Sequence, residues 1–166
     1  VHAAEELEHE EGEEHEHEHG LIDPHFWLDP LNAKVQVDNI LAAFVKADPE
    51  NADFYRSNAE DLKSRLDALH QEFVDGLADR TKNVIVTTHE GFDYLAERYG
   101  FEAYGVIGIS GDSQPSGHDM KELTDLVKSL GLHYVFGEPI YSNDLINTIA
   151  DGTGAQGMCL FLCAAM

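Results

Sequence analysis

The stretch Val84-Ile85-Val86-Thr87-Thr88-His89 decides the fold of this chain. A continuous run of β-branched residues is typical of a strand buried on both faces, as in a parallel sheet covered by helices. The run ends at His89, so the sequence predicts an imidazole at the carboxyl end of this strand. In parallel sheets this is the edge where ligands gather. Glu138 follows a later predicted strand and is expected at the same edge.

Helices and strands alternate along the rest of the chain. Gly100 and Gly131 follow apolar helical segments as C-terminal stops, and Ser116 precedes the second of these as an N-cap. Four strands alternating with helices predict an α/β fold, in which right-handed crossovers build a parallel sheet with flanking helices. The predicted elements are helices at about 91–99, 117–130 and 142–151, and strands at 84–88, 106–109, 134–136 and 158–162.

Two helix-start signals precede the deciding strand. Asp29-Pro30 and Asp48-Pro49 each combine an N-cap carboxylate with a proline at the first helical position. Apolar residues at helical spacing follow both, which predicts a helix at about 31–47 and a much longer, strut-like helix ending near Gly76. The predicted organisation is a disordered His/Glu-rich loop at 1–20, a helical segment at 21–80 and an α/β lobe at 81–166.

The charge balance restricts the classes of ligand. The chain has 166 residues, with 32 acidic and 10 basic side chains and a formal net charge of −22. Such a charge repels nucleic acid and anionic membrane surfaces and attracts cations. No apolar run approaches the roughly 20 residues that cross a bilayer, and none follows a basic stretch as in a signal peptide. Cationic ligands are favoured, while nucleic-acid binding and direct membrane insertion are not expected.

Histidines alternate with glutamates in His15-Glu16-His17-Glu18-His19. Neutral imidazole is a good ligand for zinc, copper and nickel, and the carboxylates add a potential that attracts divalent cations. We interpret His15, His17 and His19 as a flexible metal-capturing tract. The alternatives are a solvated polyanionic loop or a purification scar, although glutamates between the histidines are not typical of tags.

Two further histidines occupy restrained positions. His25 lies between a proline-fixed turn and the aromatic pair Phe26-Trp27 at a helix start, which limits its rotamers. A metal ligand benefits from such rigidity, although an isolated histidine of this kind is more often a packed or capping residue. His89 ends the buried strand. No second histidine completes a His-Glu-x-x-His motif there, and no phosphate loop or nucleophile elbow occurs, so the sequence does not favour an enzyme.

The cysteines Cys159 and Cys163 lie four positions apart in the last predicted strand. That spacing separates their Cα atoms by roughly 13 Å, beyond the limit of about 7 Å for a disulfide. We expect both to be buried apolar residues rather than metal ligands.

In combination these segments resemble the zinc-binding (ZnuA-like) solute-binding proteins of ABC metal importers. The resemblance covers nearly all of residues 15–155. It is carried by the His-Glu-His-Gly run, by Asp23-Pro-His-Phe-Trp-Leu-Asp-Pro30, by the Asp48-Pro49 helix start, by Val86-Thr-Thr-His89 with Phe92, Tyr94 and Tyr99-Gly100, and by Glu138-Pro139. Members have two α/β lobes joined by a long helix, with the metal in the cleft. The helix beginning near Pro49 would be that interlobe helix.

The resemblance also implies the metal and its ligands. His25 matches the ligand of an Asp-Pro-His-x-Trp motif, and His89 matches a ligand at the end of a second-lobe strand. Manganese members carry a glutamate at this second position, so zinc is favoured over manganese, with Glu90 left open as an oxygen donor. His15, His17 and His19 match a His- and acid-rich loop near the cleft. Most of the first lobe, with another histidine ligand, would precede residue 1, and an aspartate-bearing region would follow residue 155.

The implied function is capture of zinc at the periplasmic or extracellular face of the membrane and delivery to the permease of an ABC importer. Zinc affinity is expected to fall below about pH 6.5, because protonated imidazole does not bind metal. One alternative is a metal buffer or chaperone that binds zinc only through the N-terminal tract. Another is a metal-dependent hydrolase with Glu90 or Glu138 as general base, which nothing in their spacing requires.

Overall fold

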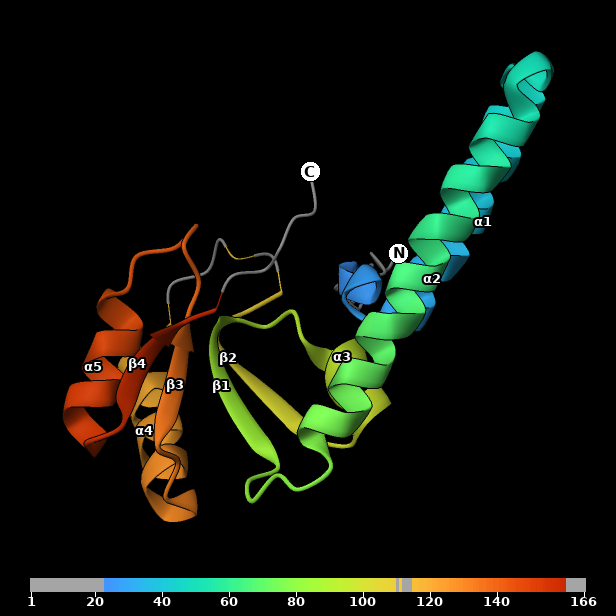
Figure 1. Ribbon diagram of the computed structural model, residues 1–166. Coiled ribbons are helices and arrows are strands. Elements are labelled where there is room, and N and C mark those ends of the chain that lie inside the picture. The colour runs from blue at the N-terminus through green and yellow to red at the C-terminus, as the bar shows by residue number, and fades with distance from the viewer. Residues whose placement is uncertain (1–22, 110, 112–114, 161–166) are drawn as a thin grey trace, which may run out of the picture.

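A computed structural model describes residues 23–109, 111 and 115–160 of the chain. A hairpin of two long helices projects from a unit in which strands and helices alternate (Figure 1). The elements, in chain order, are η1 His25–Leu28, α1 Pro30–Ala47, η2 Pro49–Asn51, α2 Ala52–Leu77, β1 Val84–His89, α3 Asp93–Tyr99, β2 Glu102–Ile107, α4 Gly117–Leu130, β3 Tyr134–Gly137, α5 Asp144–Thr153 and β4 Gln156–Cys159.

The four strands form one parallel sheet in the order β2-β1-β3-β4. This confirms the predicted α/β fold. The deciding stretch is β1, which pairs with β2 on one side and β3 on the other. Thr87 of β1 is in register with Phe136 of β3, so His89 and Glu138 each follow two residues later at the same level of the sheet.

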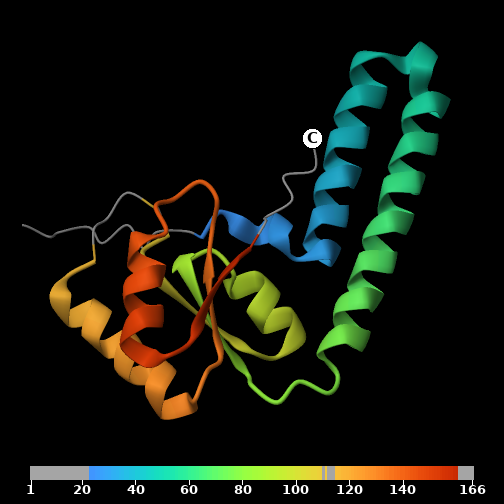
Figure 2. The ribbon, with the colours of Figure 1, turned by 60° about the vertical axis from the view of Figure 1, so that its left-hand side comes forward.

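The core lies between the sheet and the pair α4–α5. In Figure 2, α4 and α5 lie together on one side of the strands, and α3 lies on the other. Right-handed crossovers explain this arrangement, because the chain moves one way from β1 to β2 and the opposite way from β2 to β3 and β4. The buried cluster consists of Val86, Val106, Val127, Leu132, Val135, Ile146, Ile149 and Ala150.

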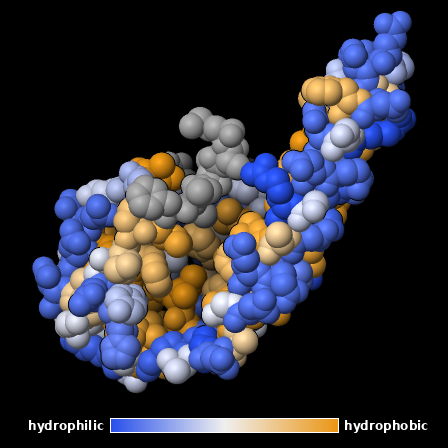
Figure 3. Space-filling view, viewed as in Figure 1, coloured by the Kyte–Doolittle hydropathy of each residue, from blue (hydrophilic) through white to orange (hydrophobic). Residues whose placement is uncertain are grey.

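The opposite face of the sheet is less well covered. Tyr134 of β3 and Met158 of β4 are each about half exposed, at 49% and 47%. A space-filling view shows apolar residues gathered in a hollow between polar surfaces (Figure 3). On the helix hairpin, large apolar side chains also face solvent, namely Val35, Ile40, Phe44, Phe54, Leu62, Leu69 and Val74.

The helix hairpin is joined to the α/β unit through α3. Tyr99 of α3 stacks on Phe73 of α2 with ring centroids 4.9 Å apart, and its hydroxyl lies 3.0 Å from Nδ1 of His70.

Among the described residues, no helix is both long and apolar enough to cross a membrane.

The signals that begin and end helices are confirmed at several positions. Asp29 caps α1 with its side chain, and Ser116 forms a capping box with Asp119 at the start of α4. Gly100 and Gly131 end α3 and α4 in the left-handed conformation, with φ of 72° and 56°, which glycine adopts without strain.

Three expectations need correction. β2 begins at Glu102 rather than near residue 106, and β4, Gln156–Cys159, begins two residues before the predicted start at 158. Residues 161 and 162 of that predicted strand lie outside the described residues. Cys159 is exposed rather than buried, because β4 is an edge strand whose four residues all face solvent. Cys163 and the loop predicted at 1–20 lie outside the described residues.

Candidate metal centre

His89 is the last residue of β1 and is buried, with 4% of its surface exposed. Oε1 of Glu138 accepts hydrogen bonds from its backbone N–H, at 3.0 Å, and from its ring Nδ1, at 2.8 Å. Glu138 itself is fully buried, and its backbone N–H donates to the hydroxyl of Thr88. Since a carboxylate only accepts, the hydrogen of the neutral ring lies on Nδ1 and the lone pair of Nε2 is free for a metal.

His25 is held in the same way at the start of η1. Oδ1 of Asp23 accepts from its backbone N–H, at 2.9 Å, and from its ring Nδ1, at 2.7 Å. Pro24 has helical backbone angles, with φ of −80° and ψ of −11°, so a carboxylate two residues before the histidine can reach its ring. This hydrogen bond again leaves Nε2 as the atom available to a ligand.

The two free ring nitrogens face each other. Nε2 of His25 lies 3.3 Å from Nε2 of His89, and the rings meet edge to face with centroids 4.9 Å apart. Two nitrogens bound to one tetrahedral zinc at its usual bond length lie about 3.3 Å apart. The separation therefore fits two imidazoles that share a cation, and the structure brings together two histidines separated by 64 positions.

The carboxylates beside these rings each have one oxygen that could accept a further hydrogen bond. Oδ2 of Asp23 and Oε2 of Glu138 are buried and accept no hydrogen bond from the described part of the chain. Oε2 of Glu138 also lies 2.7 Å from Nδ1 of His89, out of line for a hydrogen bond. A cation bound by the two rings would offset this negative charge, as in the carboxylate–histidine–metal arrangements common in zinc proteins.

Further acidic side chains surround the two histidines. Burial raises the pKa of Glu90, and the nearby charges of Asp93 and Asp23 raise it further. The pKa of Asp93 is raised by burial and by the charge of Asp23, whereas His25 lowers it. Carboxylates that raise one another's pKa values mark a region of negative potential, which favours entry of a cation.

Aromatic rings and a glycine limit how the His89 ring can move. Phe92 and Tyr141 contact it with centroids 6.1 Å and 5.4 Å away. At Gly91 a Cβ atom would lie 2.5 Å from Nε2 of His89, so the absence of a side chain leaves room for the ring. Nε2 of His89 is thus held in place in the metal-free protein.

Two protein ligands are fewer than zinc takes. Structural zinc sites have four and catalytic ones three. Within 23–109, 111 and 115–160, no group of three or more histidine, cysteine, aspartate or glutamate side chains has the geometry of a metal site. His15, His17 and His19 lie outside the described residues.

Two residues of this site had no partner assigned from the sequence. Glu138 was expected at the same sheet edge as His89, but its hydrogen bonds to that residue were not predicted. Equal offsets of two positions from the paired residues Thr87 and Phe136 are the signal that could have shown it. For Asp23, the signal is its place two positions before His25 with a proline between.

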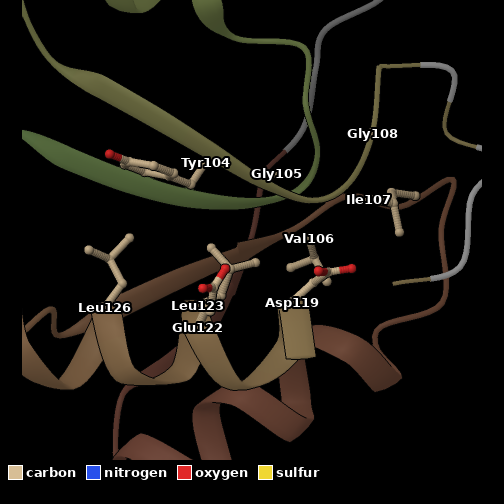
Figure 4. A pocket seen from close by; sticks show the side chains of 9 residues that line it. All are labelled: Tyr104, Gly105, Val106, Ile107, Gly108, Asp119, Glu122, Leu123 and Leu126. Carbon is tan, nitrogen blue, oxygen red and sulfur yellow. The ribbon is translucent and has the colours of Figure 1, made fainter. Parts of the chain in front are cut away.

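A concave region lies away from the histidines. It is a groove of about 380 Å³ between the edge strand β2 and α4, floored by Val106 and Leu123 and flanked by Asp119 and Glu122 (Figure 4). Asp119 is already engaged in the capping box of α4, and Glu122 lies 3.3 Å from the exposed His118. The groove therefore offers no arrangement comparable to the facing imidazoles.

Comparisons with known proteins match this chain to zinc-uptake proteins. The family model described as "Zinc-uptake complex component A periplasmic" matches residues 1–162. The "High-affinity zinc uptake system protein ZnuA" of Brucella abortus is 38% identical over 137 residues, covering 82% of this chain and 41% of that protein. Its counterpart in Bacillus subtilis is 34% identical, covering 88% of this chain and 49% of the relative. The chain thus spans less than half the length of these curated relatives.

Solved structures agree with the sequence matches. The laminin-binding protein Lbp of Streptococcus pyogenes superposes with a TM-score of 0.80 at 33% identity, over 84% of this chain and 55% of the other. At that identity and TM-score, the α/β architecture and its connections are shared.

Proposed function

Because the chain belongs to the family of periplasmic zinc-uptake components, we propose that it captures zinc outside the cytoplasmic membrane and delivers it to the permease of an ABC-type importer. The family consists of zinc-binding proteins of uptake systems, so the chain is not an enzyme and zinc is its cargo. The observation that carries the proposal is the 3.3 Å separation of two Nε2 atoms whose rings are each held by a carboxylate.

In this proposal His25 and His89 are the zinc ligands of this part of the protein. Each ring presents an unprotonated nitrogen, and nitrogen ligands favour zinc over manganese, which prefers oxygen. The negative potential from Glu90 and Asp93 draws the cation toward the site. Zinc is the metal named for the relatives, since a related structure is that of a Zn(II)-bound mutant variant of AdcAII of Streptococcus pneumoniae.

The remaining ligands come from outside the described residues. We propose that His15, His17 and His19 collect zinc and pass it to His25 and His89, and that a part of the intact protein beyond this chain completes the coordination. The organisation expected from the sequence fits this role: a collecting loop at 1–20, a helical segment at 21–80 with α2 as the interlobe helix, and an α/β lobe at 81–166.

Delivery requires release. A site completed by ligands from two bodies opens when those bodies separate, and two imidazoles alone bind zinc more weakly than three or four ligands. Contact with the permease would separate the bodies and leave zinc on the weaker half-site. Tight zinc binding during capture and zinc release at the membrane then both follow from a site whose ligands come from two bodies.

Zinc titration against a chromophoric chelator tests the proposal. His25→Ala and His89→Ala should each weaken binding, and His118→Ala serves as a matched control because that histidine is exposed and lies 3.3 Å from the exposed Glu122 on α4. Deleting residues 1–19 should leave binding that still depends on His25 and His89. If the deletion abolished binding and the two substitutions had no effect, the chain would instead be a metal buffer acting through its N-terminal tract.

A further inference from the structure

Asp29 is a buried carboxylate that the zinc site does not use directly. Only 1% of its surface is exposed. Its Oδ1 accepts from the backbone N–H of Leu31 at 2.9 Å, which caps α1. Its Oδ2 accepts from Nε–H of Arg98 at 2.8 Å and lies 2.6 Å from Nη2 of the same guanidinium in an ion pair. The two oxygens therefore perform separate tasks, one in the helix cap and one in an ion pair.

The ion pair connects the two chain segments that carry the histidines. Asp29 lies directly after η1, which begins at His25, and Arg98 lies in α3, the helix that follows β1 and His89. A second contact supports the same arrangement, because the hydroxyl of Tyr94 in α3 donates to the backbone oxygen of Asp23 at 3.4 Å. The short segment around His25 is thus attached to α3 on both sides of the histidine.

We propose that the Asp29–Arg98 ion pair positions His25 for zinc by fixing η1 against α3 at the distance that lets both imidazoles reach one ion. This inference rests on the proposed function, in which His25 and His89 share zinc. A charge-assisted hydrogen bond from Nε, with Nη2 of the same guanidinium beside the same buried oxygen, restricts rotation of the guanidinium and its helix relative to η1. Loss of the pair would let η1 shift while the N-terminal cap of α1 stays formed.

Asp29→Asn separates the two tasks. Asparagine is as good an N-cap as aspartate, so the cap of α1 is kept, while the charge that holds Arg98 is removed. Asp67→Asn is the matched control, because Asp67 forms an exposed ion pair with Lys34 between α1 and α2, remote in sequence from η1. Four variants would be made in the full chain: Asp29→Asn, Asp67→Asn, His25→Ala and the double variant Asp29→Asn/His25→Ala.

The dissociation constant for zinc would be measured by chelator competition, together with the melting temperature of the metal-free protein. Asp29→Asn should weaken zinc binding about tenfold, the lower end of the range for residues that orient metal ligands. Asp67→Asn should stay within about twofold of the unmodified chain, since exposed ion pairs contribute little. The double variant should bind no more weakly than His25→Ala, because there is no ligand left to position.

Other results would overturn the inference. If Asp29→Asn lowered the melting temperature but left zinc affinity unchanged, the ion pair would have a structural role only, and the zinc site itself would stand. An additive loss in the double variant would likewise show that the ion pair does not act through His25. If His25→Ala bound zinc as tightly as the unmodified chain, the proposed function and this inference would fail together. If Asp29→Asn does not fold, Arg98→Lys provides the test. Lysine keeps the positive charge but lacks the planar guanidinium group, so this variant should bind zinc several-fold more weakly.

Discussion

Glu138 binds His89 at two points: its Oε1 accepts from the ring Nδ1 at 2.8 Å and from the backbone N–H at 3.0 Å. One buried oxygen therefore sets both the tautomer of the ring and its place at the end of β1. Asp23 repeats the arrangement for His25. The two ligand atoms face each other because each ring is held from behind by an acid.

Glu138→Gln should weaken zinc binding about tenfold, the lower end of the range for residues behind a metal ligand. Glutamine has nearly the same shape but removes the negative charge that makes the ring a stronger ligand. Glu122→Gln is the control, because Glu122 is exposed and its ion pair with His118 lies on the surface of α4. Chelator competition measures both. Equal affinities for the two variants would show that Glu138 serves folding alone.

Ile149→Ala should destabilise the fold by about 2–5 kcal/mol, because it opens a cavity in the cluster between the sheet and α5. Ile149 is fully buried, whereas Ile140 is 76% exposed. The same substitution at Ile140 should change stability by no more than about 0.5 kcal/mol. Urea unfolding of the metal-free protein measures the difference. A small loss at Ile149 would contradict the assignment of the core to this face of the sheet.

Ser116→Ala should cost about 1 kcal/mol of stability, since it removes one half of the capping box of α4. The Ser116 hydroxyl accepts from the backbone N–H of Asp119, and a carboxylate oxygen of Asp119 accepts from the backbone N–H of Ser116. Ser129→Ala in the same helix is the control, because its exposed hydroxyl donates to the backbone oxygen of Leu126 and takes no part in the cap. Thermal unfolding would distinguish the two, and equal melting temperatures would argue against the cap.

Glu90→Gln should stabilise the metal-free protein near pH 7.5, and the gain should disappear near pH 4. Burial, followed by the charges of Asp93 and Asp23, raises the pKa of Glu90 in the folded state. A carboxyl group with a raised folded pKa opposes folding when ionised, so its cost is present above that pKa and absent below the unfolded value of about 4.3. Melting temperatures at the two pH values, each compared with the unmodified chain, measure the effect. A constant difference would contradict it.

Much of the fold could be predicted from local patterns, because particular residue types begin and end its helices and form its central strand. The β-branched run predicted β1, the two Asp-Pro pairs predicted the hairpin helices, and Gly100 and Gly131 marked helix ends. Edge strands were predicted less well. β2 starts with Glu102 and includes the exposed Tyr104, so its first half lacks an apolar signal. For β4, pairing with β3 sets the position, and the apolar residues after it misled the prediction.

The site was predicted in part. Rigid surroundings pointed to His25, and the end of a buried strand pointed to His89, but no local pattern contains a contact across 64 positions. The resemblance to zinc-binding proteins supplied that pairing. The carboxylates behind the rings depend on sheet register and on a turn at Pro24, and the link from Asp29 to Arg98 depends on how α3 packs against η1. These relationships arise only in the folded chain.

The most direct test is the position of zinc in a crystal of this chain, located by anomalous diffraction at the zinc edge. We predict a peak about 2.0–2.1 Å from Nε2 of both His25 and His89, with Asp23 and Glu138 still bound to the opposite ring nitrogens. A zinc ion bound by only one of these rings, or bound entirely elsewhere on the chain, would contradict the shared site.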